Sequence, residues 1–108
     1  MCVFCQIVAQ EIKAKIIYED NDFLAFEDIH KKAEIHYLII PKKHIDSVFS
    51  EGSENVIKEM ILRVKKIVEQ KQIIGFKLLF NVGKEGGQTI NHLHLHFLSG
   101  KGIEKLTV

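Results

Sequence analysis

The segment from Glu54 to Gln70 is the one long stretch of the chain whose apolar residues recur with the period of an α-helix. These residues are Val56, Ile57, Met60, Ile61, Val64, Ile67 and Val68, and lysines and glutamates occupy the opposite side. A helix with one apolar face has to bury that face against another layer of structure. The rest of the chain must therefore supply a surface for this helix to cover.

Five short apolar segments are candidates for that surface, because each is bounded by polar residues. They span residues 14–20, 23–28, 35–44, 76–83 and 92–98. The polar turn at residues 20–22 joins the first two as a hairpin, and Pro41 should end the third, since proline cannot donate to a ladder. Apolar residues at helical offsets predict a short helix within residues 2–10. We therefore expect an α+β fold, with a five-stranded antiparallel sheet, one long helix and one short N-terminal helix.

The length of 108 residues suits one domain, residues 1–108, with one functional site. The formal net charge of +1 provides no basic surface for a nucleic acid. No apolar run approaches the roughly 20 residues of a membrane span, and the first residues lack the pattern of a signal peptide. We expect a cytoplasmic protein that binds neither nucleic acid nor membrane.

Three of the six histidines alternate with apolar residues at His92, His94 and His96. Alternation on a strand places these imidazoles on one face, which we expect to be accessible, and turns the apolar side chains between them into the core. At about 3.3 Å per residue the outer two histidines lie roughly 13 Å apart, which disfavours a metal ion held by all three. Acid–base or nucleophilic chemistry is favoured over a merely solvated strand face, with the central His94 as the nucleophile.

The loop before these histidines contains the sequence GGQT at residues 86–89. The two glycines allow the main chain to approach a ligand closely, and Gln88 and Thr89 add hydrogen-bond donors. Such donors suit a phosphate. A glycine pair alone is more often a simple turn, and its position next to the alternating histidines makes the interpretation specific.

The only cysteines, Cys2 and Cys5, form a C-x-x-C pair close to the N-terminus. In a reducing compartment such a pair is a metal half-site, a pair of inert thiols or a redox pair, rather than a structural disulfide. A thioredoxin-like redox motif follows a strand, and no strand can precede residue 2. The sequence therefore favours a metal half-site or inert thiols over redox chemistry.

The segment HLHLHFL at residues 92–98 resembles the His-φ-His-φ-His-φ-φ signature of the histidine-triad (HIT) superfamily of nucleotide hydrolases and transferases, where φ is apolar. The similarity extends over nearly the whole chain, through FCQIVAQEI, FLAFEDI, HYLIIPKKHI and FNVGKEGGQT. The compact length and the GGQT segment look most like the Hint branch of nucleoside phosphoramidases. The resemblance implies a symmetric homodimer whose two sheets join into one sheet of ten strands.

The resemblance also implies a role for individual residues. His94 would attack the α-phosphorus and form a nucleotidyl-imidazole intermediate, and His96 would contact the phosphate. His36 would join His92 in ordering protons around the nucleophile, and Asp28 would accept the ribose hydroxyls. The phosphate and leaving group would be lined by Asn81, Gly87, Gln88 and Thr89, and the base by Phe4, Ile7, Ile12, Phe26 and Ile29.

Some superfamily members with an N-terminal C-x-x-C pair bind zinc, and the resemblance implies the ligands Cys2, Cys5, His44 and His92. Such a closed Cys₂His₂ set would be structural, and catalysis would need no metal. The implied function is hydrolysis of the P–N bond of purine nucleoside 5′-phosphoramidates, with a purine nucleoside monophosphate or phosphoramidate as ligand. The alternatives are a dinucleoside polyphosphate hydrolase with the same nucleophile and a nucleotide-binding adaptor with incidental activity.

Overall fold

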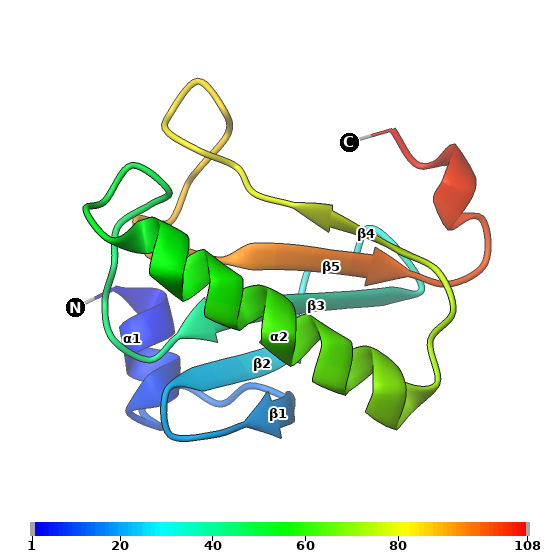
Figure 1. Ribbon diagram of the computed structural model, residues 1–108, viewed down its shortest axis with the longest axis horizontal. Helices are drawn as coiled ribbons and strands as arrows, with labels where there is room; N and C mark the ends of the chain where they lie inside the picture. The colour runs from blue at the N-terminus through cyan, green and yellow to red at the C-terminus, as the bar shows by residue number, and fades with distance from the viewer. Residues whose placement is uncertain (1, 108) are drawn as a thin grey trace.

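The computed structural model describes residues 2–107 of the chain. Its elements are, in order, α1 (Val3–Val8), β1 (Ile16–Glu19), β2 (Phe23–Glu27), β3 (Ile35–Pro41), α2 (Ser53–Lys71), β4 (Phe76–Leu79), β5 (Leu95–Ser99) and the short 3₁₀ helix η1 (Ile103–Lys105). The strands form one antiparallel sheet in the order β1-β2-β3-β5-β4 (Figure 1). The expected α+β architecture, with five antiparallel strands, one long helix and one short N-terminal helix, is confirmed.

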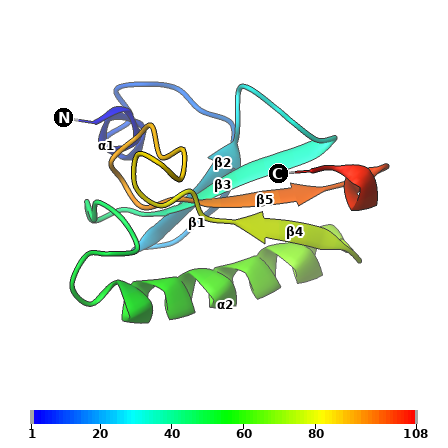
Figure 2. The ribbon, with the colours of Figure 1, turned by 90° about the horizontal axis from the view of Figure 1, so that it is seen from above.

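Helix α2 covers one face of the sheet along its whole length (Figure 2). Its buried residues Met60, Val64 and Ile67 repeat at the spacing that the sequence predicts for one helix face. They pack against sheet residues of the same core, including Ile39 of β3 and Phe97 of β5. Burial of these apolar side chains against the sheet, rather than helix propensity alone, stabilises this layer.

The opposite face of the sheet is covered by α1 and by the loops that precede β1 and β5 (Figure 2). A second, smaller core on this face contains Phe4, Leu24, Phe26, Leu38 and Ile40. Side chains alternate across a strand, so adjacent residues of β3 serve different cores. The short N-terminal helix therefore has a definite place, because Phe4 anchors it over this face of the sheet.

Strand β5 begins at Leu95, three residues after the predicted start at residue 92. The main chain just before it is engaged elsewhere, because the N–H of Leu93 donates to the carbonyl of Ile45 and the N–H of His92 donates to the carbonyl of Ile90. Of the three alternating histidines, only His96 lies in the sheet, where it is opposite Leu38 of β3. The other two histidines lie on the approach to the strand, between the sheet and α1.

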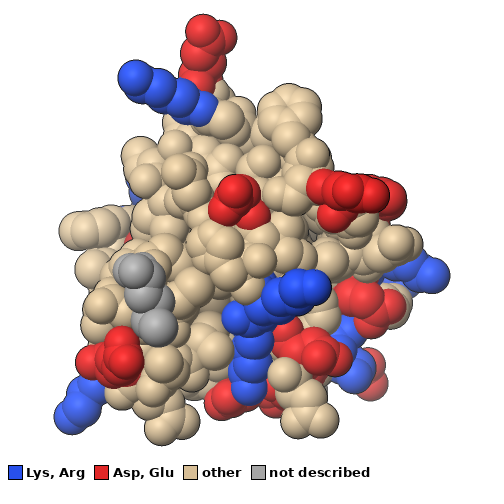
Figure 3. All heavy atoms as spheres, turned by 90° about the vertical axis from the view of Figure 1, so that its left-hand side faces the viewer, with Lys and Arg blue, Asp and Glu red and all other residues tan. Residues whose placement is uncertain are grey.

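The surface mixes charges of both signs. Figure 3 shows acidic and basic side chains interleaved around a largely uncharged area on one face of the molecule. Ion pairs join Lys15 and Lys31 to Glu27, and exposed pairs of this kind contribute little to stability because solvent screens them. Within residues 2–107, none of the helices combines the length and the apolar character needed to cross a membrane.

Candidate active site and metal site

A cavity of about 510 Å³ lies between α1, the end of β2 and the loop before β5. Its walls are mostly apolar near α1, and its polar groups gather at the histidines. Of the residues that the sequence predicts for nucleotide binding and catalysis, the cavity brings together Phe4, Ile7, Ile12, Phe26, Asp28, Ile29, His36, Asn81, Gly87, Thr89, His94 and His96. An apolar pocket with a few convergent polar groups is the usual form of a small-molecule site.

Two of the predicted residues do not line this cavity. Gln88 instead fastens its own loop: its side-chain amide donates to the carbonyls of Asp46 and Ile90, and its side-chain carbonyl accepts from the N–H of Gly83. His92 lies behind the cavity wall and is fully buried. These two residues support the site from outside, whereas Gly87, in the left-handed conformation with φ 86°, lies in its wall.

Two of the three alternating histidines are far less accessible than the sequence predicts. His92 and His94 are 0% and 8% exposed, whereas His96 is half-buried. The expectation of an accessible face was wrong because α1 covers it: the ring of Phe4 lies edge-on to both His92 and His94, with ring centroids 5.8 and 5.1 Å away. His94 and His96 therefore line a cavity rather than an open strand face.

Burial keeps the imidazoles of the cavity neutral at pH 7. It is the main cause of the lowered pKa of His36, His94 and His96, since desolvation disfavours the charged ring. The shift is large for His96, whose pKa falls to about 4 because the neighbouring His94 and His36 add to the effect of burial. Neutral imidazoles offer one lone pair and one N–H each, which is the form required of a nucleophile.

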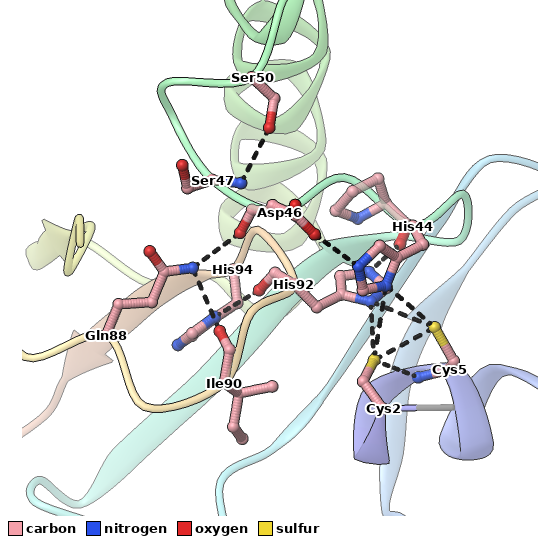
Figure 4. A network of polar contacts seen from close by, with 11 residues as sticks. Cys2, Cys5, His44, Asp46, Ser47, Ser50, Gln88, Ile90, His92 and His94 are labelled. Carbon is pink, nitrogen blue, oxygen red and sulfur yellow. Dashed lines mark hydrogen bonds and ion pairs between the residues drawn. The ribbon is translucent and has the colours of Figure 1, made fainter. Parts of the chain in front are cut away.

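The orientation of His94 is set by a main-chain carbonyl. Its Nδ1 lies 2.8 Å from the carbonyl oxygen of His92, which can only accept a hydrogen bond (Figure 4). The proton of the neutral ring is therefore on Nδ1, and Nε2 carries the lone pair. Because His94 lines the cavity, this lone pair is available to a ligand in the cavity.

Asp28 lies at the end of β2, beside the histidines of the cavity. One of its carboxylate oxygens accepts the N–H of His30 at 2.8 Å, which closes a tight turn. Its other oxygen lies 3.4 Å from Nε2 of His36, and that same nitrogen lies 2.9 Å from Nδ1 of His96. The donor atoms of Asp28, His36 and His96 all lie within 4.8 Å of one another, so these residues form one compact cluster in the cavity wall.

A second cluster joins Cys2, Cys5, His44 and His92, the four residues for which the family resemblance implies a metal (Figure 4). The two sulfur atoms lie 3.1 Å apart, and the sulfur-to-Nδ1 distances to the two histidines are 3.3 to 3.6 Å. A tetrahedron with zinc bonds of about 2.0–2.3 Å has edges of roughly 3.3–3.8 Å. The cluster therefore fits a tetrahedral metal ion after a small opening of the sulfur pair.

The hydrogen bonds around this cluster prepare both histidines as ligands. Nε2 of His92 lies 2.8 Å from the carbonyl of Pro41, and Nε2 of His44 lies 2.8 Å from the carboxylate of Asp46. Both acceptors require the proton on Nε2, so each Nδ1 presents its lone pair to the two thiols. Burial opposes ionisation of Cys2, but hydrogen bonds with the side chain and the main-chain N–H of Cys5 outweigh it and lower the pKa of the Cys2 thiol. The donor set matches the chemistry of zinc.

Sequence patterns did not identify three of the groups that orient these histidines. Asp46 follows His44 by two residues, a spacing that could have suggested the pair. The carbonyl of Pro41 and the N–H of Lys32 are main-chain groups, for which no sequence signal exists. They become visible only when the fold brings distant segments together.

Comparisons with known proteins agree on one superfamily. The family model described as "Scavenger mRNA decapping enzyme C-term binding" matches residues 1–106. Protein HitA of Neisseria gonorrhoeae is 42% identical over 100 residues, which cover 90% of this chain and 94% of that protein. A histidine triad protein from Clostridium difficile superimposes with a TM-score of 0.88 at 38% identity, covering 93% of this chain and 90% of the other. A HIT family hydrolase from Legionella pneumophila gives 0.85 at 39% identity and covers 94% of both chains.

Proposed function

Since the chain belongs to the histidine-triad superfamily, we propose that it is a hydrolase of the Hint type, which cleaves the P–N bond of purine nucleoside 5′-phosphoramidates. The observation that carries this proposal is the fixed ring of His94. Its Nδ1–H is tied to the carbonyl of His92, and its Nε2 lone pair is left in a cavity of about 510 Å³. The similar Legionella protein is described as a hydrolase, which supports the same class of reaction.

The cavity offers a separate region for each part of a nucleotide. The apolar side chains of Phe4, Ile7 and Phe26 would contact the two faces of the base. Asp28 would accept the ribose hydroxyls through the carboxylate oxygen that does not bond His30. The main chain at Gly87 and the hydroxyl of Thr89 would contact the phosphate, and the open space beyond them would receive the leaving amine.

The reaction follows from two in-line substitutions at phosphorus. In the first, Nε2 of His94 forms a bond to the α-phosphorus while the P–N bond of the substrate breaks, and the amine leaves with a proton that the Thr89 hydroxyl passes from solvent. In the second, water attacks the same phosphorus, the bond to His94 breaks, and the water proton returns to solvent. The products are the amine and the nucleoside monophosphate. Positioning and hydrogen-bond donors lower the barrier, and no catalytic metal is needed.

Zinc at Cys2, Cys5, His44 and His92 would have a structural role. Held by these four side chains, the ion would supply a closed structural site that would tie α1 to the segment after β3. His92 connects this site to the nucleophile, because its ring faces the thiols while its main-chain carbonyl holds Nδ1 of His94. We therefore propose that the metal helps to hold the His94 ring in place.

A second copy of the chain would complete the molecule as a homodimer. In residues 2–107, β4 is an outer strand of the sheet, and it carries the half-exposed apolar residues Phe76 and Leu78, with the fully exposed Ile74 just before it. An exposed apolar edge strand is a ready template for pairing with another chain. Pairing of two β4 strands about a two-fold axis would give a ten-stranded sheet.

The decisive experiment follows turnover of adenosine 5′-phosphoramidate by the wild type, His94→Asn and His94→Gly. Acid-quenched wild-type protein should carry an adenylyl group, and His94→Asn should lose both the adduct and turnover while it still binds AMP. Added imidazole should restore turnover to His94→Gly, because it can occupy the space of the missing ring. Full activity of His94→Asn would refute the proposed nucleophile. Faster wild-type turnover of a diadenosine polyphosphate would reassign the substrate, and AMP binding without turnover of either compound would favour the adaptor.

A further inference from the structure

The main-chain N–H of Lys32 donates to Nδ1 of His36 across 3.2 Å. A main-chain N–H can only donate, so Nδ1 of His36 has to be the acceptor nitrogen. A neutral imidazole carries one proton, which must then be on Nε2. His36 is 1% exposed, so water is not at hand to favour the other tautomer.

The same logic continues from His36 to His96. The Nε2 proton of His36 has two acceptors in reach, Nδ1 of His96 at 2.9 Å and the carboxylate of Asp28 at 3.4 Å. The shorter contact is the better hydrogen bond, so Nδ1 of His96 accepts. The proton of the neutral His96 ring is therefore on Nε2. This nitrogen has no hydrogen-bond partner among the described residues, and the His96 side chain lines the cavity.

We propose that the main-chain N–H of Lys32 is a positioning group that fixes the tautomers of His36 and His96, so that His96 presents an N–H donor to the phosphate. The neighbouring ring of His94, with its centroid 5.1 Å from that of His96, is fixed in the opposite sense and presents a lone pair. One acceptor carbonyl and one donor amide thus give two adjacent imidazoles different functions. The effect on turnover rests on the proposed function, whereas the tautomers themselves do not.

The chemical value of this arrangement is that His96 contributes a donor at a neutral ring. An Nε2–H of His96 can bond a phosphate oxygen while His94 attacks the phosphorus, and charge that develops on that oxygen strengthens the bond. With the other tautomer, His96 would turn a lone pair toward the phosphate and repel it. Fixing the proton on Nε2 therefore excludes the tautomer of His96 that would repel the phosphate, and His96 does not have to be charged to donate a hydrogen bond.

Long-range ¹H–¹⁵N NMR spectra of the protein with ¹⁵N-labelled histidine test the assignment directly. We expect protonation at Nε2 for His36 and His96 and at Nδ1 for His94 in the wild type at pH 7. A wild-type spectrum with the proton of His36 on Nδ1 would overturn the inference. This outcome requires no variant, so the inference remains testable even if a variant fails to fold.

Two substitutions at the same position separate the main chain of Lys32 from its side chain. Lys32→Pro and Lys32→Ala both remove the ammonium group, but only proline removes the N–H. We expect Lys32→Ala to keep the wild-type tautomers and Lys32→Pro to show a mixture at His36 and His96. The kcat of Lys32→Pro for adenosine 5′-phosphoramidate should lie about tenfold below that of Lys32→Ala, the size of one lost hydrogen bond in a transition state.

The outcomes also separate this inference from the proposed function. Unchanged tautomers in a folded Lys32→Pro protein would refute the role of the N–H, whatever the rate. Equal kcat values for the two variants, with altered tautomers in only one, would refute the effect on catalysis. The expected tautomers in a wild type that turns over neither substrate would leave the assignment intact and refute the hydrolase.

Discussion

Two clusters of histidines lie on the same side of the sheet, and both bring their donor atoms close together. Cys2, Cys5, His44 and His92 form one, and Asp28, His36 and His96 form the other, each with its ligand atoms within 4.8 Å. In the first, acceptors outside the cluster hold the protons on Nε2, so both Nδ1 lone pairs face the thiols. In the second, the N–H of Lys32 forces a proton of His36 into the centre of the cluster. Outer hydrogen bonds thus prepare the first cluster to bind a metal ion, whereas they link the side chains of the second cluster by hydrogen bonds.

Removal of the two cysteine thiols should have the largest effect, which is the loss of bound zinc and of the stability that zinc provides. The wild type should retain one zinc ion per chain, and the Cys2→Ser, Cys5→Ser double variant should retain none. With zinc at about 1,000 times its dissociation constant, the lost ion corresponds to about 4 kcal/mol of stability, or a Tm lower by about 15 °C or more. Metal analysis after dialysis and thermal unfolding would measure both. Asp28→Asn is the matched control, and loss of the retained zinc in that variant would contradict the comparison.

Acid should destabilise the folded protein through His96, which belongs to the cluster of Asp28, His36 and His96. Its pKa in the folded protein is about 4, against 6.5 for an exposed histidine, so the unfolded chain binds more protons between these values. The stability that the neutral ring contributes is present above pH 6.5 and is lost as the pH falls toward 4. We expect His96→Asn to lose about 1–2 kcal/mol less than the wild type between pH 7 and pH 4.5, because solvent screens this partly buried ring and reduces the full effect of the shift. Urea unfolding of both proteins, each loaded with zinc, would show it, and parallel losses would refute the cause.

Removal of the Lys32 N–H should make the two clusters more alike. In Lys32→Pro, His36 can move its proton to Nδ1 and direct a lone pair toward His96 and Asp28. A second zinc ion should then bind about tenfold more tightly than in Lys32→Ala, and AMP should compete with it. Zinc titration of protein already loaded at the first site would measure this affinity. An equally tight second zinc ion in Lys32→Ala would show that the tautomer does not protect the cluster.

The comparison also shows how far the sequence alone could predict this molecule. Strong periodicity predicted the sheet and α2, because the apolar residues on one face of the helix have to be buried and the sheet provides most of the surface that buries them. The same periodicity placed the start of β5 at residue 92, and it failed there because the main chain of Leu93 bonds Ile45 instead of a neighbouring strand. The accessible histidine face was wrong for a similar reason, since it depends on where Phe4 of α1 lies. Alternation along one strand carries no information about what covers it.

The candidate site shows the same limit at the level of single atoms. The resemblance to the superfamily implied that Cys2, Cys5, His44 and His92 meet, and the structure brings them together. The resemblance also implied that His36 joins His92, whereas the structure places His36 beside His96 and Asp28. The direction of each proton depends instead on the carbonyl of Pro41, the carbonyl of His92 and the N–H of Lys32. Every residue except proline has both of these main-chain groups, so their roles arise only from the fold.

The smallest effect on zinc affinity should come from Asp46, which contacts the cluster of Cys2, Cys5, His44 and His92 from outside. Its carboxylate accepts the Nε2 proton of His44, but its side chain is 72% exposed, so water can replace it. Loss of such a partner typically weakens metal binding by 10–100-fold, and we expect Asp46→Ala to lie at or below the lower end, at about tenfold. Glu51→Ala, which removes an exposed carboxylate from the same loop, is the matched control. Competition with a zinc chelator would compare the affinities, and a loss as large as that of the double cysteine variant would mean that Asp46 itself binds the metal.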